Sequence, residues 1–320
     1  MFAFAHGFHR RFSCTLGGII LTAIAFHAPP AVRADDQADK IQALWNRQNG
    51  DITSGKFEVV LYRYFDHGAR LLDHAEAVRR LEGLKPNAEE ADVEPIFNDL
   101  EALGWPKKQS FLWGTRIDVT IDGPKLANVT HRTKGNDLRF FDGTSTTSYR
   151  AVNRQATIEA GRSGVHLLGM REIRCIPVDL IDWKKTLVIE PAEGRDAVLR
   201  SNGFTVRFDR DTGFVKTLTQ AHDGAIANQT LQFGPTDVQG RILPRMTVEL
   251  RMENDKVRMA SIYLIKSCRP NVAINPNDFR LGVSAGTVIV DHRKQHAPPT
   301  AVRVPIDLED ATRYRDVIPR

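Results

Sequence analysis

Gly282-Val-Ser-Ala-Gly286 is the segment whose residue types come nearest to a catalytic motif. In hydrolases with a Gly-x-Ser-x-Gly motif, a strand precedes the serine and a helix follows it, so that the hydroxyl is lifted at a strained turn. Here the next residues, Thr287-Val-Ile-Val290, predict a strand, and Asp291 and His292 follow too soon to lie on separate loops. We interpret Ser284 as part of a glycine-hinged turn. A small exported serine hydrolase is kept as a third hypothesis, after the two binding functions described at the end of this section.

Three acid–histidine pairs and one aspartate-rich segment could supply metal ligands; the pairs are Asp66-His67, Asp73-His74 and Asp291-His292. Metal sites need ligands at defined spacings, such as His-x-x-x-His on a helix, and no such motif occurs. Asp209-Arg-Asp-Thr-Gly213 begins like a calcium loop but lacks the later ligands, so it predicts a turn. The chain also has no phosphate-cradling loop and no dinucleotide fingerprint, so we predict neither a metal nor a cofactor.

The clearest secondary-structure pattern lies in residues 240–293. Apolar residues occupy every second position from Met246 to Met252, and polar residues fill the positions between them. This period of two is typical of a half-buried strand. The short polar segment Glu253-Asn-Asp-Lys256 separates it from a second apolar run at 257–265. The two runs therefore predict an antiparallel hairpin.

Similar runs rich in β-branched and aromatic residues recur along the chain, at 56–65, 111–113, 116–121, 126–133, 138–141, 144–149, 156–159, 187–189, 196–201, 204–209, 214–220 and 225–233. Asp122-Gly123 and Asp142-Gly143 are turn signals between consecutive runs. Strands at this spacing, with little helix between them, predict a meandering antiparallel sheet.

Helical periodicity is expected in only a few places. Residues 35–48 predict a short amphipathic helix with Ile41, Leu44 and Trp45 on one side. Residues 67–104 predict a helical insert that packs on an apolar sheet face or serves as a lid. The irregular connection at 161–185 includes a short helix near 179–184. Residues 294–320, with Pro298-Pro299, predict a tail that lies on the surface or is disordered.

The first 34 residues are typical of a secretory signal. Arg10 and Arg11 precede an apolar core at 16–25, and Val32-Arg33-Ala34 offers small residues before the cleavage point. The apolar run is shorter than the roughly 20 residues that span a bilayer. Cys14 lies before this run, so a lipid anchor is not expected. We predict a periplasmic or secreted protein with no membrane span after signal cleavage.

The charge balance argues against a nucleic-acid partner. The chain has 44 Lys and Arg against 39 Asp and Glu, and Arg10, Arg11 and Arg33 would leave with the signal. The remaining protein is nearly neutral, which gives no electrostatic basis for binding nucleic acid. Cys175 and Cys268 remain after cleavage; they form one disulfide or stay as separate buried thiols, and both readings are open.

The order of these elements resembles the outer-membrane lipoprotein-sorting family (LolA/LolB-like). The resemblance is carried by the signal, the first helix, the closing meander and these motifs: Gly55-Lys-Phe-Glu-Val-Val60, Asp142-Gly143, Phe208-Asp-Arg-Asp-Thr-Gly-Phe214 and Gly240-Arg-Ile-Leu-Pro-Arg245. It implies an α+β, mainly β domain over residues 35–293. In that fold a strongly curved antiparallel sheet, an incomplete barrel, wraps around a few helices, and its apolar concave face holds acyl chains.

We therefore expect an exported, non-enzymatic protein that binds an acyl chain, lipid or lipidated protein. Each buried methylene contributes roughly 0.8 kcal/mol, so an apolar cavity needs no specific polar contact. The residues expected to line it are Phe57, Val59, Leu61, Trp113, Met246, Val248, Leu250 and Met252. One alternative is that they form a closed core. Another is an envelope protein-interaction or sensor module, in which the same face docks a partner protein.

Overall fold

A computed structural model describes residues 34–50, 52–65, 72–73, 112–161, 181, 187–201, 203–222, 224–253, 256–293 and 299–317, without the side chains of 34–36, 49–50, 64–65, 72–73 and 112–113. The signal predicted for residues 1–34 and the insert predicted at 67–104 lie almost entirely outside these residues. Cys175 lies outside them as well, so the disulfide remains a prediction.

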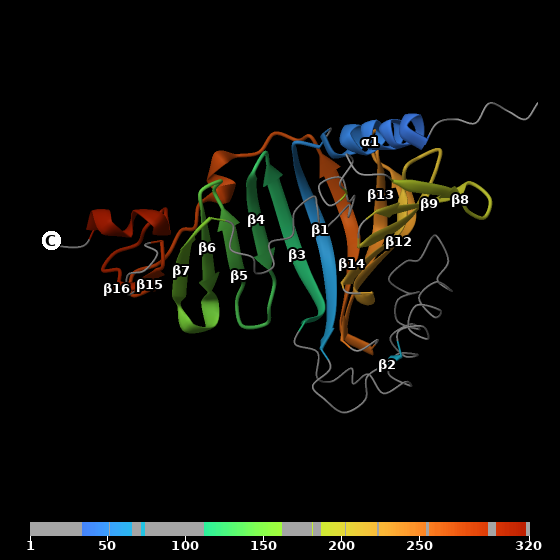
Figure 1. Ribbon diagram of the computed structural model, residues 1–320. Helices are drawn as coiled ribbons and strands as arrows, with labels where there is room; N and C mark the ends of the chain where they lie inside the picture. Colours follow the sequence, from blue (N-terminus) through green and yellow to red (C-terminus); the bar gives the residue numbers. More distant parts are fainter. Residues whose placement is uncertain are drawn as a thin grey trace, which may run out of the picture. The chain divides into compact units, whose positions relative to one another are not determined.

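One helix and sixteen strands make up most of the described chain (Figure 1). In chain order they are α1 (Ala34–Gly50), β1 (Ser54–Phe65), β2 (Leu72–Asp73), β3 (Leu112–Asp122), β4 (Lys125–Thr130), β5 (Asp137–Phe141), β6 (Ser145–Arg150), β7 (Gln155–Ala160), β8 (Val188–Pro191), β9 (Asp196–Ser201), β10 (Phe204–Asp209), β11 (Val215–His222), β12 (Ala225–Asp237), β13 (Ile242–Glu253), β14 (Lys256–Pro270), β15 (Val288–Asp291) and β16 (Thr300–Arg303). Short 3₁₀ helices are η2 (Ala151–Asn153), η4 (Pro276–Phe279) and η5 (Ala311–Val317).

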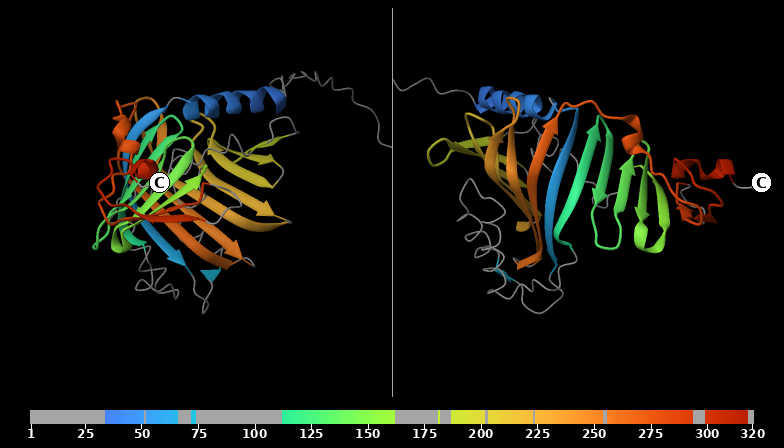
Figure 2. Two further views of the ribbon diagram at one scale, coloured as in Figure 1. Left: turned by 90° about the vertical axis from the view of Figure 1, so that its left-hand side faces the viewer. Right: turned by 180° about the vertical axis from the view of Figure 1, so that it is seen from behind.

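All sixteen strands belong to one sheet, with the order β16-β15-β7-β6-β5-β4-β3-β1-β14-β13-β12-β11-β10-β9-β8, and β2 beside β14. The sheet is strongly curved and does not close (Figure 2). The predicted fold class, mainly β with a curved, incomplete barrel, is confirmed. The β-hairpins at Asp122-Gly123 and Asp142-Gly143 are also as predicted.

The expectation of a purely antiparallel sheet is wrong at one pair. β15 pairs with β7 in parallel, with Ile289 opposite Ala156 and Val290 opposite Thr157. Parallel neighbours require a crossover, because a tight hairpin can only join antiparallel strands. Here the connection from β7 to β15 includes β8–β14, and residues 271–287 lead from the end of β14 to the far side of β7.

Helix α1 covers the apolar side of the strands near one end of the sheet (Figure 1). Ile41 and Trp45 are buried in a cluster with side chains of β9, β10 and β11, and the Trp45 ring meets the Phe208 ring edge-on at 5.4 Å. Trp45 Nε1 also donates a 2.8 Å hydrogen bond to the Gly213 carbonyl. The amphipathic helix predicted for residues 35–48 is confirmed, and its apolar side is the one that packs.

The C-terminal residues are part of the fold, so the predicted surface tail is corrected. β16 pairs with β15, and Val304, Ala311 and Tyr314 are buried against the side chains of β4–β7. The sequence shows only scattered apolar residues here, because 3₁₀ turns and single bridges give no sustained period. Their burial depends on a surface that β4–β7 supply from elsewhere in the chain.

Two further local expectations change. Within the predicted helical insert, Leu72–Asp73 forms the strand β2, with Leu72 opposite Val257 and Asp73 opposite Lys256. Pairing with β14 satisfies the backbone at this point, which outweighs the local helical pattern. Of the helix expected near 179–184, the described chain includes only Ile181, which is buried in a bend beside α1.

Candidate functional site

Strand register assigns the side chains of the central strands to two faces. Leu61, Tyr263 and Thr247 lie opposite one another on β1, β14 and β13, and the next row holds Leu264 and Met246. Opposed residues point to the same face, and adjacent residues along a strand point to opposite faces. We call the side of Leu61 face A and the side of Met246 face B.

Face A of β1 and β3 carries one apolar cluster. Phe57, Val59 and Leu61 of β1 pack there with Ile117 and Val119 of β3, and all five side chains are buried. Phe57 lies opposite Val119, and Val59 opposite Ile117. Three of the eight predicted site residues therefore do come together.

Face B of β12, β13 and β14 carries a second apolar surface. Met246, Val248 and Leu250 form its central row and are at most 1% exposed. Val248 lies opposite Ile262 on one side and Leu231 on the other. Face B is thus mainly apolar across three long neighbouring strands, with Gln229 of β12 opposite Leu250 as a polar exception, and these side chains are buried in the molecule.

The expectation that the eight residues line one cavity is corrected. Phe57, Val59 and Leu61 lie on face A, whereas Met246, Val248 and Leu250 lie on face B. Met252 continues the β13 row and is half-buried, and Trp113 lies in β3 with its side chain outside the described residues. A period of two shows which residues of one strand share a face, but only the pairing through β14 relates β1 to β13. Which of these residues contact a ligand remains a prediction.

A buried polar network lies on face A beside the apolar cluster, and the sequence did not predict it. Arg63 donates to Ser261 Oγ at 3.0 Å and to the Tyr263 hydroxyl at 3.1 Å, and that hydroxyl donates to Glu249 Oε2 at 3.1 Å. Burial, followed by the charge of Glu249, raises the pKa of Tyr263 to about 12. Thr247 is also buried and Glu249 is half-buried, whereas Arg251 and Glu253 are exposed, so only the C-terminal part of β13 turns its polar positions to solvent as expected for a half-buried strand.

Ser284 does not occupy a nucleophile elbow. It is exposed, and the chain passes from a single bridge at Val283 through a turn at Gly286 into β15, so no helix follows the serine. Asp291 is held by Arg293, Arg315 and Tyr314. Hydrogen bonds from Arg293 hold the pKa of Asp291 well below its usual range. The predicted glycine-hinged turn is confirmed, and the hydrolase hypothesis loses the geometry that its motif requires.

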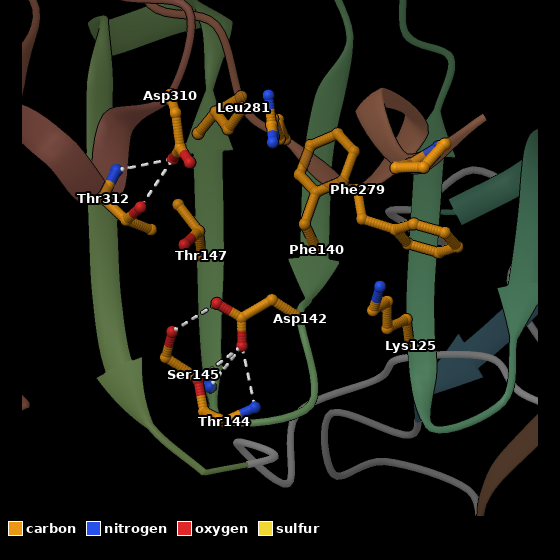
Figure 3. Close-up of a pocket in the computed structure, with 12 residues that line it drawn as sticks. Lys125, Phe140, Asp142, Thr144, Ser145, Thr147, Phe279, Leu281, Asp310 and Thr312 are labelled. Atoms are coloured by element: carbon orange, nitrogen blue, oxygen red, sulfur yellow. Dashed lines mark hydrogen bonds between the residues drawn. The ribbon is translucent and has the colours of Figure 1, made fainter.

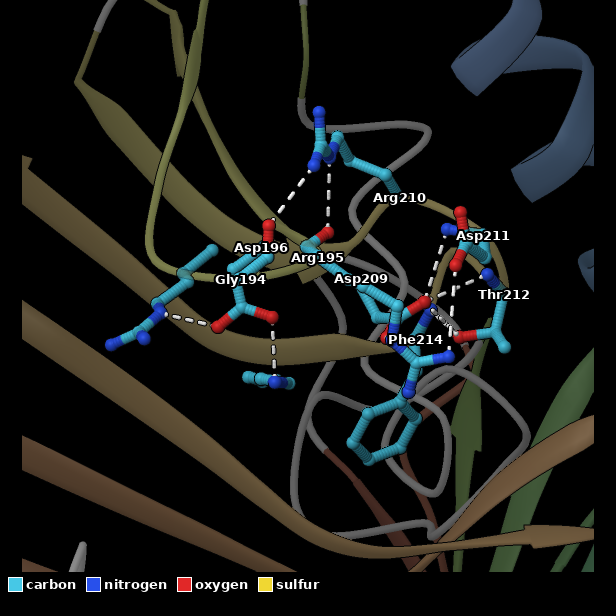
Figure 4. Close-up of polar contacts among 10 residues, drawn as sticks. Gly194, Arg195, Asp196, Asp209, Arg210, Asp211, Thr212 and Phe214 are labelled. Carbon is cyan, nitrogen blue, oxygen red and sulfur yellow. Dashed lines mark hydrogen bonds and ion pairs between the residues drawn. The ribbon is translucent and has the colours of Figure 1, made fainter.

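The segment Asp209-Arg-Asp-Thr-Gly213 is a closed turn (Figure 4). Asp209 Oδ1 accepts from the Asp211 and Thr212 amides at 3.0 and 2.9 Å and from Thr212 Oγ1 at 3.0 Å. Arg210 reaches the carbonyls of Gly194 and Arg195 and so joins this turn to the β8–β9 hairpin. The Asp209 carboxylate accepts hydrogen bonds from its own loop, so the segment is the turn that was predicted.

The part of the chain that the structure describes has neither a metal cluster nor a membrane-spanning helix. It includes no group of three or more acidic, histidine or cysteine side chains placed to hold a metal ion. Asp66, His67 and His74 lie outside those residues. Among the helices that the structure describes, none is both long and apolar enough to cross a bilayer.

Comparison with known proteins yields structural likenesses only. No protein-family model matches the chain, and no curated protein matches it. A LolA superfamily protein from Nitrosomonas europaea is similar over 76% of this chain and 97% of its own, with 8% identity and a TM-score of 0.46. A DUF1329 family protein from Desulfovibrio piger is similar over 77% of this chain and 95% of its own, with 8% identity and a TM-score of 0.37. The fold itself rests on the strand pairing described above.

Proposed function

We propose that the protein is an exported, non-enzymatic carrier of an acyl chain, a lipid or a lipidated protein, and that face B of β12–β14 is its binding surface. The observation that supports this is the apolar row of Met246, Val248 and Leu250, with Leu231 of β12 and Ile262 of β14 on either side of Val248. A curved sheet with an extended apolar face must keep that face from water, and a bound hydrocarbon is one way to do so.

The chemistry of this surface suits an acyl chain. Met246 is flexible and polarizable, and such side chains adapt to irregular apolar shapes. Each methylene removed from water contributes roughly 0.8 kcal/mol, so a long chain binds without a polar anchor. We assign the face A cluster of Phe57, Val59 and Leu61 to the structural core, because it packs against side chains of β3 and Tyr263, and Tyr263 also belongs to the buried polar network.

Native mass spectrometry of the mature protein, purified from the periplasm without detergent, tests the proposal. Added masses that match an acyl lipid and disappear on organic extraction are expected. The intact mass also tests export, because a chain beginning at residue 35 is expected. A single bare mass from lipid-rich cells would overturn the carrier proposal. Copurification of one protein without lipid would instead favour an envelope interaction module that uses the same face.

Two valines provide a matched comparison. Val59 on face A and Val248 on face B are equally buried, at 1% and 0% exposure. Val→Ala at either site removes two methylene equivalents and should cost about 2 kcal/mol of folding free energy. Only Val248→Ala should also weaken binding of a fluorescent fatty acid, by fivefold or more. Equal effects of both variants on fatty-acid affinity would remove face B as the binding surface.

A further inference from the structure

A separate pocket lies away from the face B surface of β12–β14, between β4–β6 and the segment that carries η4 and η5 (Figure 3). Its volume is about 300 Å³, and it is lined by phenyl rings, hydroxyls and charged side chains. This volume is at the lower end of the range for small-molecule sites, and mixed apolar and polar linings are typical of them. The carrier proposal makes no use of this pocket.

Thr147 lines the pocket with a hydroxyl that has no partner. The residue is only 4% exposed, and its side chain makes no hydrogen bond to any residue that the structure describes. Thr146, the next residue along β6, is 1% exposed and points to the opposite face, where its hydroxyl donates to the Gly161 carbonyl at 2.8 Å. The residue is buried, but its hydroxyl oxygen is open to the pocket, so it can donate to or accept from a ligand.

Two cations line the same pocket without an ionic partner. Within the described chain, Lys125 and Arg280 form no ion pair, and the Lys125 ammonium lies 5.8 Å from the centre of the Phe279 ring. Charge-assisted hydrogen bonds are about twice as strong as neutral ones, so either cation would favour an anionic ligand.

The two carboxylates of the pocket are already engaged by their own turns (Figure 3). Asp142 accepts from the amides and hydroxyls of Thr144 and Ser145, at 2.7–3.1 Å. Burial acts to raise the pKa of Asp142, but these hydrogen bonds outweigh it and leave the pKa lowered. Asp310 accepts from the amide and hydroxyl of Thr312 at 2.9 and 2.7 Å. The groups left for a ligand are therefore the hydroxyl and the two cations.

The remaining wall is apolar. Phe140 and Phe279 come from β5 and η4, and Leu281 follows η4; all three are buried and belong to one cluster. Figure 3 shows both rings on the side of the pocket that carries Lys125. A hydrocarbon body lying on these rings would place its charged end within the same cavity as the cations.

We propose that this pocket binds a small monoanionic organic acid, whose carboxylate pairs with Lys125 and Arg280 and meets the Thr147 hydroxyl, and whose apolar body packs on Phe140 and Phe279. A neutral polyol would leave both cations unpaired, and an organic cation could form an ion pair with neither of them.

The test uses the mature protein and isothermal titration calorimetry at low salt, with benzoate as the probe. Benzamide serves as the neutral isostere and benzylammonium as the cation. We expect benzoate to bind saturably, with an affinity at least tenfold higher than that of benzamide or benzylammonium. No saturable binding of benzoate, or equal binding of benzamide, would overturn the proposal.

Variants assign the binding to these residues. Thr147→Val and Lys125→Met should each weaken benzoate binding at least fivefold, whereas Thr146→Val should lower the melting temperature and leave the affinity unchanged. If Thr147→Val fails to fold, Lys125→Met at the pocket wall carries the test alone. Unchanged benzoate affinity in both pocket variants would contradict the assignment. Val248→Ala should not alter benzoate binding, so the benzoate experiment can succeed or fail independently of the carrier proposal.

Discussion

Tyr314 donates a 2.9 Å hydrogen bond to Oδ2 of Asp291, which lies 23 positions earlier in the chain. Both residues are buried, and Asp291 also accepts from Arg293 at 2.8 Å and from Arg315 at 3.2 Å. The carboxylate therefore ties η5 to β15 and completes the wall over β4–β7.

Tyr314→Phe should destabilise the protein without disturbing its packing. The ring remains, but the charged acceptor loses one donor, which costs roughly 1.5–3 kcal/mol for a hydrogen bond to an ionised group. Urea unfolding followed by circular dichroism measures the change. Tyr149→Phe is the control, because the Tyr149 hydroxyl makes no hydrogen bond to a described residue, and it should change stability little. Equal unfolding midpoints for wild type and Tyr314→Phe would show that the bond to Asp291 is not formed.

Asp291→Asn should lose stability near neutral pH and much less in acid. Hydrogen bonds from Arg293 hold the pKa of Asp291 below its usual range, so the folded state favours the ionised carboxylate. That stabilisation is fully present above the unfolded-state pKa of about 3.9 and is lost as pH falls below it. The difference in unfolding free energy between wild type and Asp291→Asn should therefore shrink between pH 5 and pH 2. A difference that stays constant across this range would argue against the ionic role.

Alanine substitutions at two glycines with left-handed backbone distinguish the conformational cost of adding a Cβ from the cost of a steric clash. Gly213 has φ +70° and Gly224 has φ +83°, and an alanine in that region costs about 1–2 kcal/mol. A Cβ at Gly213 would lie 2.6 Å from Leu44 Cδ2 of α1, whereas a Cβ at Gly224 would meet nothing within 4 Å. Gly213→Ala should thus lower stability by about 1–3 kcal/mol more than Gly224→Ala, because it overpacks the helix contact.

Thermal unfolding of the two alanine variants, with near-ultraviolet circular dichroism for the Trp45 environment, provides the readout. The Trp45 signal should change only in Gly213→Ala, since Trp45 donates to the Gly213 carbonyl. Equal losses of stability in the two variants would mean that α1 does not dock against the β10–β11 turn as described.

Tyr263 should remain protonated in alkali that ionises ordinary tyrosines. Burial and the nearby Glu249 raise its pKa to about 12, above the unfolded value of about 10. The neutral phenol therefore contributes stability below pH 10, and this contribution is lost as pH rises toward 12. In absorbance titrations at 295 nm, wild type and Tyr263→Phe should coincide up to pH 11. A step near pH 10 that only the wild type shows would place Tyr263 in contact with water.

Much of the local structure could be predicted from the sequence, because it depends on short-range patterns. The β12–β14 meander follows from the alternation of apolar and polar residues along each strand. The turns at Asp142-Gly143 and Asp209-Arg-Asp-Thr-Gly213 follow from aspartates whose carboxylates accept hydrogen bonds from nearby amides. Helix α1 follows from the spacing of Ile41 and Trp45. The pocket of Figure 3 could not be foreseen, since Thr147 and Arg280 are far apart in the chain and only the crossover brings them together.

The sequence by itself determined which residues of one strand share a face, where the hairpins turn and that the protein is mainly β, since each depends on neighbours within a few positions. Tertiary structure decided which faces of different strands coincide. Val59 and Val248 both alternate as buried strand residues, yet register through β14 sends them to opposite faces. It also decided that Tyr314 and Val304 are core residues, because their burial needs the surface of β4–β7, which no local pattern near the C-terminus encodes.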